Sequence, residues 1–135
     1  MHIYIPIENR YTYEQARIFA EILGTLVAGA RPDLFTTPRS VAKRDKGKVY
    51  FDHLQIGEGK TISAPYVLRA YDGAPVSTPL EWNEIRPGLS PQQFHIGNAL
   101  ERFARVGDLF QDVLKKRQGI EKPFEKLERQ FKARR

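Results

Sequence analysis

The sequence contains no cysteine among its 135 residues. This absence excludes disulfide bonds, thiolate nucleophiles and cysteine-ligated zinc, and it suits a reducing compartment. Three histidines are present, at positions 2, 53 and 95, too scattered for a helical zinc-binding pair. No apolar run approaches the ~20 residues that a membrane-spanning helix needs, and no basic leader precedes an apolar segment. We therefore expect a cytoplasmic protein with no membrane partner.

The common catalytic and phosphate-binding motifs are also missing. Glu81 and Glu84 occupy what reads as a surface turn, and no serine stands in the setting of a nucleophile elbow. Gly59-Lys60-Thr61 ends like a phosphate-binding loop, but that motif needs glycine at the position of Leu54. Pro65 argues against the helix that has to follow such a loop. Lys60 therefore reads as a solvated lysine after a glycine turn.

The net charge of +6 is unevenly distributed. Residues 1–114 hold 13 basic and 13 acidic side chains, whereas residues 115–135 hold nine basic and three acidic ones. Two interpretations of this basic C-terminal tail stay open, a solvated end and a DNA-contacting element. A second basic cluster lies inside the balanced part and offers possible DNA contacts at Arg39, Lys43, Arg44, Lys46 and Lys48.

Helices are predicted with the clearest boundaries. Thr12 and Gln15 form a capping box, and apolar residues at helical spacing follow until Gly29, with Pro32 just beyond as a stop. A last helix is predicted with Pro123 in its first turn and an apolar stripe at Phe124, Leu127 and Phe131. Further helical segments are expected at 37–44, after Ser90-Pro91, at 99–106 and at 109–114.

Strands are predicted at 2–7 and 48–52, with an extended stretch at 61–70 and a hairpin turn at Asp72-Gly73. Helices and strands do not alternate as in a parallel α/β fold, so the sequence predicts an α+β fold. Its length and its 41% of hydrophobic residues predict a single domain over residues 1–135.

One acidic residue has an unusual place. Asp52 ends the apolar strand Val49-Tyr50-Phe51, where a buried carboxylate needs an ion or a hydrogen-bonded partner. Two interpretations are open at this point: a functional carboxylate, or a strand-end aspartate that makes a turn hydrogen bond.

Several segments, taken in order, closely resemble the polymerase domain of bacterial ligase D. They are His2 to Ile7, Tyr13 to Arg17, Gly47 to Gln55, Lys60-Thr61, Ala64 to Arg69, Gly73 to Glu84, Phe94 and Gly107 to Leu109. The resemblance covers nearly the whole chain. It corresponds to the C-terminal half of that domain, which belongs to the archaeo-eukaryotic primase superfamily.

The resemblance implies a fold and a function. We expect part of a primase-type catalytic core, with a short mixed or antiparallel sheet, packing helices and a C-terminal helix. The family adds nucleotides, often ribonucleotides, to DNA ends during bacterial non-homologous end joining. The expected partners are DNA ends, a nucleoside triphosphate, a ligase and Ku-type proteins, in a nucleoid-associated setting in a bacterial or archaeal cell.

The same resemblance implies roles for four residues. Asp52 matches the family's third motif, an apolar strand ending in a catalytic, metal-binding aspartate, with Mg²⁺ or Mn²⁺ as the cofactor. His2 matches the second motif's histidine near the nucleotide phosphates. Gln55 and Arg69 match residues that line the nucleotide pocket, and the guanidinium of Arg69 suits a triphosphate.

The sequence departs from the family pattern where the acidic chemistry is concentrated. The family's paired aspartates, Asp-x-Asp, occur nowhere in this sequence, the serine and glycines of the second motif are absent, and Ile56 replaces a common asparagine. One aspartate cannot hold two cations, so we expect no activity from the chain alone. Three interpretations follow: a piece of a longer protein, a chain completed by a separate N-terminal polymerase half, or a non-catalytic DNA- or protein-binding remnant.

Overall fold

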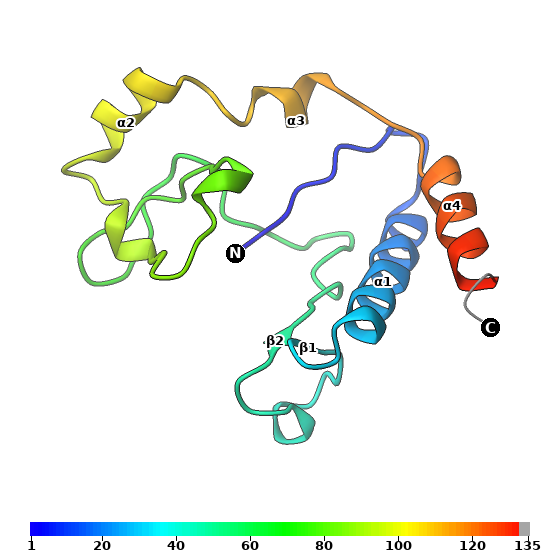
Figure 1. Ribbon diagram of the computed structural model, residues 1–135. Helices are drawn as coiled ribbons and strands as arrows, with labels where there is room; N and C mark the ends of the chain where they lie inside the picture. Colours follow the sequence, from blue (N-terminus) through cyan, green and yellow to red (C-terminus); the bar gives the residue numbers. More distant parts are fainter. Residues whose placement is uncertain (133–135) are drawn as a thin grey trace. The chain divides into compact units, whose positions relative to one another are not determined.

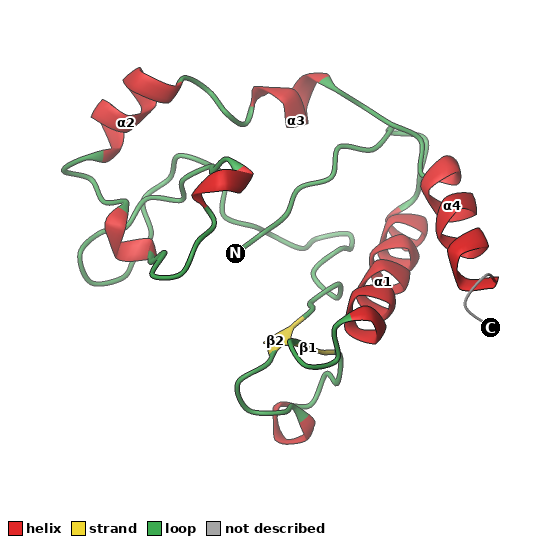
Figure 2. Ribbon diagram, viewed as in Figure 1, coloured by secondary structure: helices red, strands yellow, loops and turns green. Residues whose placement is uncertain are grey.

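The computed structural model describes residues 1–132 of the chain (Figure 1). Its elements, in chain order, are α1 (Tyr13–Ala30), β1 (Phe35–Thr36), η1 (Val41–Lys43), β2 (Val49–Tyr50), η2 (Trp82–Glu84), η3 (Pro91–Gln93), α2 (Ala99–Val106), α3 (Gln111–Lys115) and α4 (Glu121–Lys132). The elements labelled η are single 3₁₀ turns. Figure 2 shows that loops make up most of the chain between the helices. None of the helices within residues 1–132 combines the length and the apolar character needed to cross a membrane.

The internal contacts divide the chain into two compact units. Unit 1 comprises residues 1–6 and 62–117, and unit 2 comprises residues 7–61 and the chain from residue 118 onwards. The sequence-based expectation of one domain over residues 1–135 stays a prediction.

In unit 2, α1 begins as the sequence predicts. The Thr12 hydroxyl accepts a hydrogen bond from the Gln15 backbone N–H at 3.2 Å, and the Gln15 side chain accepts one from the Thr12 N–H at 2.8 Å. These bonds satisfy donors that a helix start otherwise leaves unpaired. The helix ends at Ala30, just before Pro32, as expected.

The start of α4 packs beside α1. Phe19 is buried, and its ring meets that of Phe124 edge-on with 5.1 Å between centroids. The Tyr11 hydroxyl accepts a hydrogen bond from the N–H of buried Ile120 at 3.0 Å and donates one to Glu121 at 2.6 Å. The predicted C-terminal helix is confirmed, but the side chains of Leu127 and Phe131 in its predicted stripe lie outside the described residues.

The other face of α1 supports the small sheet. Strands β1 and β2 pair in parallel, with Phe35 opposite Val49 and Thr36 opposite Tyr50. Phe51 continues this pairing through its N–H, which donates to the Thr36 carbonyl at 3.2 Å. Its ring lies against the bare backbone of Gly24 in α1, where an added Cβ would come within 2.5 Å of a ring carbon. Glycine at this position therefore lets the chain just before Asp52 lie close to the helix.

Unit 1 consists of loops and short helices around the buried side chains of Val76 and Ala99. The hairpin expected at Asp72-Gly73 is present as a single antiparallel bridge between Leu68 and Val76. Tyr66 connects this segment to α2 and to the residues that follow it: its ring packs edge-on against Phe103 of α2, with centroids 4.8 Å apart, and its hydroxyl donates to Asp108.

Three expected elements differ from the sequence predictions. The strand predicted at 2–7 is wrong, since only Ile7 forms a bridge, to Gln118. The helix predicted at 37–44 is reduced to the single turn η1. The expected mixed or antiparallel sheet is, within residues 1–132, one parallel strand pair accompanied by isolated bridges. A strand forms only with a partner strand, which an alternating sequence cannot supply by itself.

Candidate functional site

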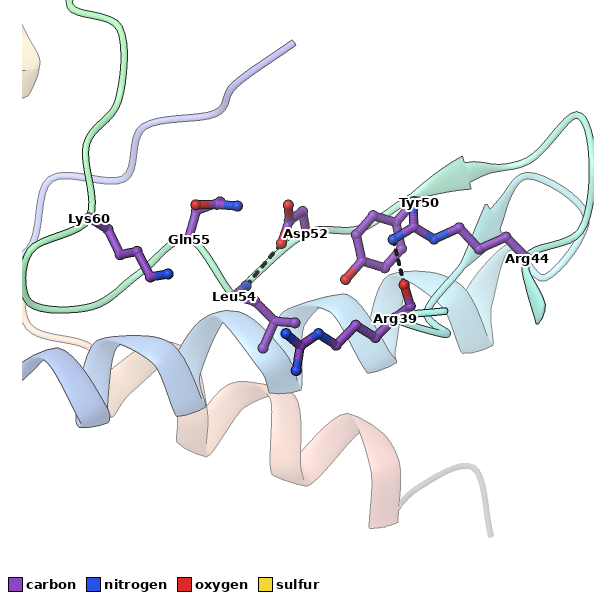
Figure 3. A pocket seen from close by; sticks show the side chains of 7 residues that line it. All are labelled: Arg39, Arg44, Tyr50, Asp52, Leu54, Gln55 and Lys60. Carbon is purple, nitrogen blue, oxygen red and sulfur yellow. Dashed lines mark hydrogen bonds between the residues drawn. The ribbon is translucent and has the colours of Figure 1, made fainter. Parts of the chain in front are cut away.

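A cavity of about 420 Å³ opens in unit 2 where β2 ends. Its walls come from the connection between β1 and β2 and from the loop that follows β2, and Figure 3 shows the side chains that line it. These are Arg39, Arg44, Tyr50, Asp52, Leu54, Gln55 and Lys60. The cavity is open to solvent on one side, and most of the side chains that line it are polar or charged.

Asp52 enters this cavity because the strand pairing and the contact of Phe51 with Gly24 fix the backbone just before it. The side chain is exposed, and its Oδ1 accepts a hydrogen bond from the Leu54 N–H at 3.0 Å. The turn hydrogen bond considered for Asp52 is therefore present. The Oδ2 atom accepts no hydrogen bond within residues 1–132, so the carboxylate also presents a free anionic oxygen.

Arg44 also lines the cavity, and its guanidinium is fixed by contacts within the protein. Its Nε donates to the Pro38 carbonyl at 3.0 Å and its Nη2 to the Arg39 carbonyl at 2.8 Å. Its guanidinium carbon lies 3.5 Å from the centroid of the Tyr50 ring, a cation–π contact. Arg44 thus joins the loop before it to strand β2, as Figure 3 shows for its bond to Arg39.

Gln55 and Lys60 come from the loop that follows β2. The Lys60 N–H donates to the Gly57 carbonyl at 3.2 Å, and Gly59 has a positive φ of 71°, a conformation that suits glycine. This glycine turn brings the exposed Lys60 side chain to the cavity. The sequence analysis did not predict that Lys60 lines the cavity, because a lysine after a glycine turn is usually solvated. The available signal was its closeness in sequence to Asp52 and Gln55.

Among the predicted site residues, the structure thus brings Asp52 and Gln55 together with Arg39 and Arg44, which were predicted as DNA contacts. His2 and Arg69 belong to unit 1 and are described there. His2 is exposed, with its ring 6.4 Å from that of Tyr4. Arg69 is half-buried, and its guanidinium carbon lies 5.7 Å from the Tyr71 ring centroid. Their role in one site with Asp52 stays a prediction.

The predicted DNA-contacting residues lie on the loop between β1 and β2. Lys43 and Lys46 are exposed and make no side-chain hydrogen bond or ion pair within the described part of the chain. Lys48 is paired with Asp45, with Nζ and Oδ2 2.7 Å apart. Within the described residues the loop therefore presents free positive charge at Lys43, Lys46 and the cavity residue Arg39.

The acidic side chains do not form a metal centre in residues 1–132. No group of three or more His, Asp or Glu side chains is close enough there to hold a metal ion, and Asp52 is the single carboxylate among the residues that line the cavity. A site for two divalent cations needs several carboxylate oxygens. This donor set does not fit such a site.

Comparison with known proteins identifies relatives of the chain. Residues 1–110 match the family described as LigD, primase-polymerase domain. The chain is 37% identical over 113 residues to the bifunctional non-homologous end joining protein LigD of Bacillus subtilis, covering 83% of this chain and 18% of that protein. It is 28% identical over 102 residues to the multifunctional non-homologous end joining protein LigD of Pseudomonas aeruginosa, covering 76% and 12% respectively.

A solved structure shows the same similarity in three dimensions. The polymerase domain of Mycobacterium tuberculosis ligase D, determined in complex with DNA, matches with a TM-score of 0.73 and 30% sequence identity. The match covers 84% of this chain and 39% of that chain. The chain therefore spans less than half the length of each of these relatives.

Proposed function

The chain belongs to the family of LigD primase-polymerase domains, and we propose that it forms the nucleotide-binding part of a polymerase that acts in DNA end joining. The reaction is template-directed nucleotidyl transfer to DNA ends, with a nucleoside triphosphate as substrate. The cavity that unites Asp52 and Gln55 with basic side chains is the observation that supports this proposal. A ligase and Ku-type proteins are the proposed partners at the DNA ends, in the cytoplasm of a bacterial or archaeal cell.

The proposal gives each predicted site residue a role. Asp52 is the catalytic carboxylate, Gln55 contacts the nucleotide, and His2 and Arg69 bind its phosphates. The basic loop between β1 and β2 contacts DNA, and Lys43 and Lys46 are exposed there. Within the primase-type α+β core, residues 1–135 then act as part of one domain.

The single cavity carboxylate supports a further part of the proposal. Because Asp52 alone does not fit two cations, we propose that the chain by itself extends no primer. Paired aspartates from the N-terminal half of such a polymerase domain, on the same or on a separate polypeptide, complete the site, and Mg²⁺ or Mn²⁺ binds there only in the completed site.

Primer extension tests this function. The purified chain is assayed on a recessed DNA end with Mg²⁺ or Mn²⁺, alone and mixed with the N-terminal half of a LigD polymerase domain, and Asp52→Asn purified in the same way serves as the control. We expect no extension by the chain alone, extension by the mixture, and none by the mixture with Asp52→Asn. Extension by the chain alone that Asp52→Asn abolishes would contradict the proposed incomplete site.

A second candidate function is a non-catalytic DNA- or protein-binding module of the same family. The hydrogen bond between Asp52 and the Leu54 N–H favours it, because this bond gives the carboxylate a structural role. This function predicts that the mixture never extends a primer, while the chain still binds DNA and Asp52→Asn binds it as well as the wild type does.

A further inference from the structure

Three cations surround the cavity, and they differ in how the protein uses them. Arg44 has two guanidinium hydrogen bonds to backbone carbonyls and stacks on Tyr50. Arg39 and Lys60 are exposed, and neither side chain has a hydrogen bond or an ion pair within residues 1–132. The first cation is therefore engaged by the protein, and the other two are available to a ligand.

Arg44 also fixes the place of Arg39. Its guanidinium donates to the carbonyls of Pro38 and Arg39. These two bonds hold the peptide groups on either side of the Arg39 Cα, from which the Arg39 side chain starts. Stacking on Tyr50 holds the same guanidinium over strand β2. Lysine carries the same charge as arginine but lacks the planar fork that makes two such bonds while stacking on a ring. The geometry of Arg44, rather than its charge, is thus what the loop uses.

The lining indicates the chemistry of a ligand. Two free cations from different loops, an amide at Gln55 and a concave wall suit a compact, multiply charged anion such as a polyphosphate. A nucleic-acid backbone is instead followed by cations spread along an open groove. Asp52 lies in the same cavity and repels an anion that enters without a cation.

We propose that Arg39 and Lys60 bind the triphosphate of the nucleotide that enters this cavity, and that Arg44 is a positioning residue that holds Arg39 toward it. This assignment rests on the proposed function. It adds Lys60 to the site and gives Arg39 a ligand other than DNA. Arg44 contacts no ligand; it acts through the backbone of residues 38 and 39.

Titration calorimetry with inorganic triphosphate, in buffer containing a chelator, tests the two binding residues on the full chain. We expect Arg39→Gln and Lys60→Gln each to raise the dissociation constant about tenfold, as loss of one charge-assisted hydrogen bond implies. Lys122→Gln removes the same charge from an exposed position at the start of α4, outside the cavity, and we expect it to change the constant by less than about twofold. Asp52→Asn is expected to tighten binding, because it removes the repelling charge.

Arg44→Lys tests the positioning role, because it keeps the positive charge but removes the planar guanidinium. We expect this variant to bind triphosphate as poorly as Arg39→Gln, with faster amide hydrogen exchange at residues 38–44. Binding at the wild-type level in Arg44→Lys would show that charge alone suffices and would overturn the positioning role.

Other outcomes overturn the binding assignment. These are no binding of triphosphate by the wild type, wild-type affinity in both Arg39→Gln and Lys60→Gln, or an equal loss in Lys122→Gln. Weaker binding of a single-stranded oligonucleotide by these two variants, with triphosphate binding unchanged, would assign the two cations to DNA. Primer extension by the reconstituted mixture is measured separately. It shows whether the chain acts in a polymerase even if Arg39 and Lys60 do not bind triphosphate.

Discussion

Asp52 combines a local structural contact with a free charge. One carboxylate oxygen closes a turn with the Leu54 N–H, while the other has no hydrogen-bonding partner in residues 1–132. Asparagine can keep the first contact, since its carbonyl oxygen accepts the same hydrogen bond, but it removes the charge. Alanine removes both. The two substitutions therefore separate the contribution of this residue to folding from its contribution to chemistry.

We expect Asp52→Asn to melt within experimental error of the wild type, and Asp52→Ala to lose about 0.5–1.5 kcal/mol of unfolding free energy with the turn hydrogen bond. Denaturant unfolding monitored by circular dichroism measures both. In the reconstituted primer-extension assay both variants are expected to be inactive. A clear loss of stability in Asp52→Asn, with extension intact, would make Asp52 purely structural.

Glu84 and Arg102 give unit 1 a pH-dependent contribution to stability. Arg102 is nearly buried, and its guanidinium lies 2.7 Å from the Glu84 carboxylate. Hydrogen bonding from Arg102 is the main cause of a lowered Glu84 pKa. A pKa that is lower in the folded state stabilises the fold above the pKa of the unfolded chain, about 4.3 for glutamate. This stabilisation is lost as the pH falls through the lower, folded value.

Glu84→Gln should therefore lower the unfolding free energy at pH 7 by about 1–3 kcal/mol, because it leaves a nearly buried arginine without its anion. The difference from the wild type should shrink as the pH falls below about 4. Urea titrations at several pH values measure this, with the exposed Glu58→Gln as the control. A constant difference between pH 7 and pH 3 would contradict the assigned role of the ion pair.

At the scale of elements, helix α1 contains two glycines in opposite surroundings. Gly24 faces the Phe51 ring, whereas a Cβ at Gly29 would meet nothing within 4 Å. Alanine favours a helix over glycine by about 0.5–1 kcal/mol at either position. At position 24 the added methyl group has to displace Phe51, and overpacking of this kind typically costs about 1–3 kcal/mol.

We therefore expect Gly29→Ala to raise the melting temperature and Gly24→Ala to lower it. Because Phe51 precedes the cavity residues Leu54 and Gln55, Gly24→Ala should also weaken triphosphate binding at the cavity, while Gly29→Ala should not. Calorimetric melting and the titration described above measure the two effects. Stabilisation by both substitutions would mean that Phe51 moves freely away from α1.

Elements whose signals are local were predicted well from the sequence. The capping box of Thr12 and Gln15 marks the start of α1 through contacts within four residues. Pro91, in the first turn of η3, and Gly107, after α2, act over similarly short distances. The strand predicted at 2–7 failed because alternating apolar residues show which faces are suited to burial but do not identify a partner strand.

The site was predicted in part for the same reason. Asp52 and Gln55 are close in sequence, so their shared place in the cavity follows from one strand end and its turn. The DNA contact predicted for Arg39 stays a prediction, and the linear cluster of charge did not show that Arg44, in the same cluster, stacks on Tyr50. Lys60 was dismissed because the loop that directs it to the cavity depends on the fold.

At the scale of the whole molecule, the basic loop and the basic C-terminal tail compete as explanations for DNA binding. Lys43 and Lys46 on the loop have no partners within residues 1–132. On the tail, Lys116 pairs with Asp112 at 2.7 Å and Arg129 with Glu125 at 3.5 Å. Exposed cations therefore occur on both segments, Lys43 and Lys46 on the loop and Lys122 and Lys126 on the tail.

We expect the double variant Lys43→Gln/Lys46→Gln to reduce the slope of log affinity for duplex DNA against log salt by about 1.8, since each phosphate contact contributes about 0.9. The matched variant Lys122→Gln/Lys126→Gln changes two exposed tail lysines and should leave the slope unchanged. Fluorescence anisotropy over a salt series measures both slopes. The reverse pattern would assign DNA binding to the tail.

The discontinuous composition of unit 2 has a consequence for the order of events on the ribosome. Once the ribosome has added Arg117, every residue of unit 1 has been made. At that point Phe124, which packs against Phe19, and Ile120 and Glu121, which bond to Tyr11, have not yet been made. At bacterial rates of about 5–20 residues per second, α1 waits several seconds for this covering surface. Closing a loop of roughly a hundred residues adds an entropic cost that local helices do not bear. During translation we therefore expect the face of α1 around Phe19 to stay uncovered until α4 has been made.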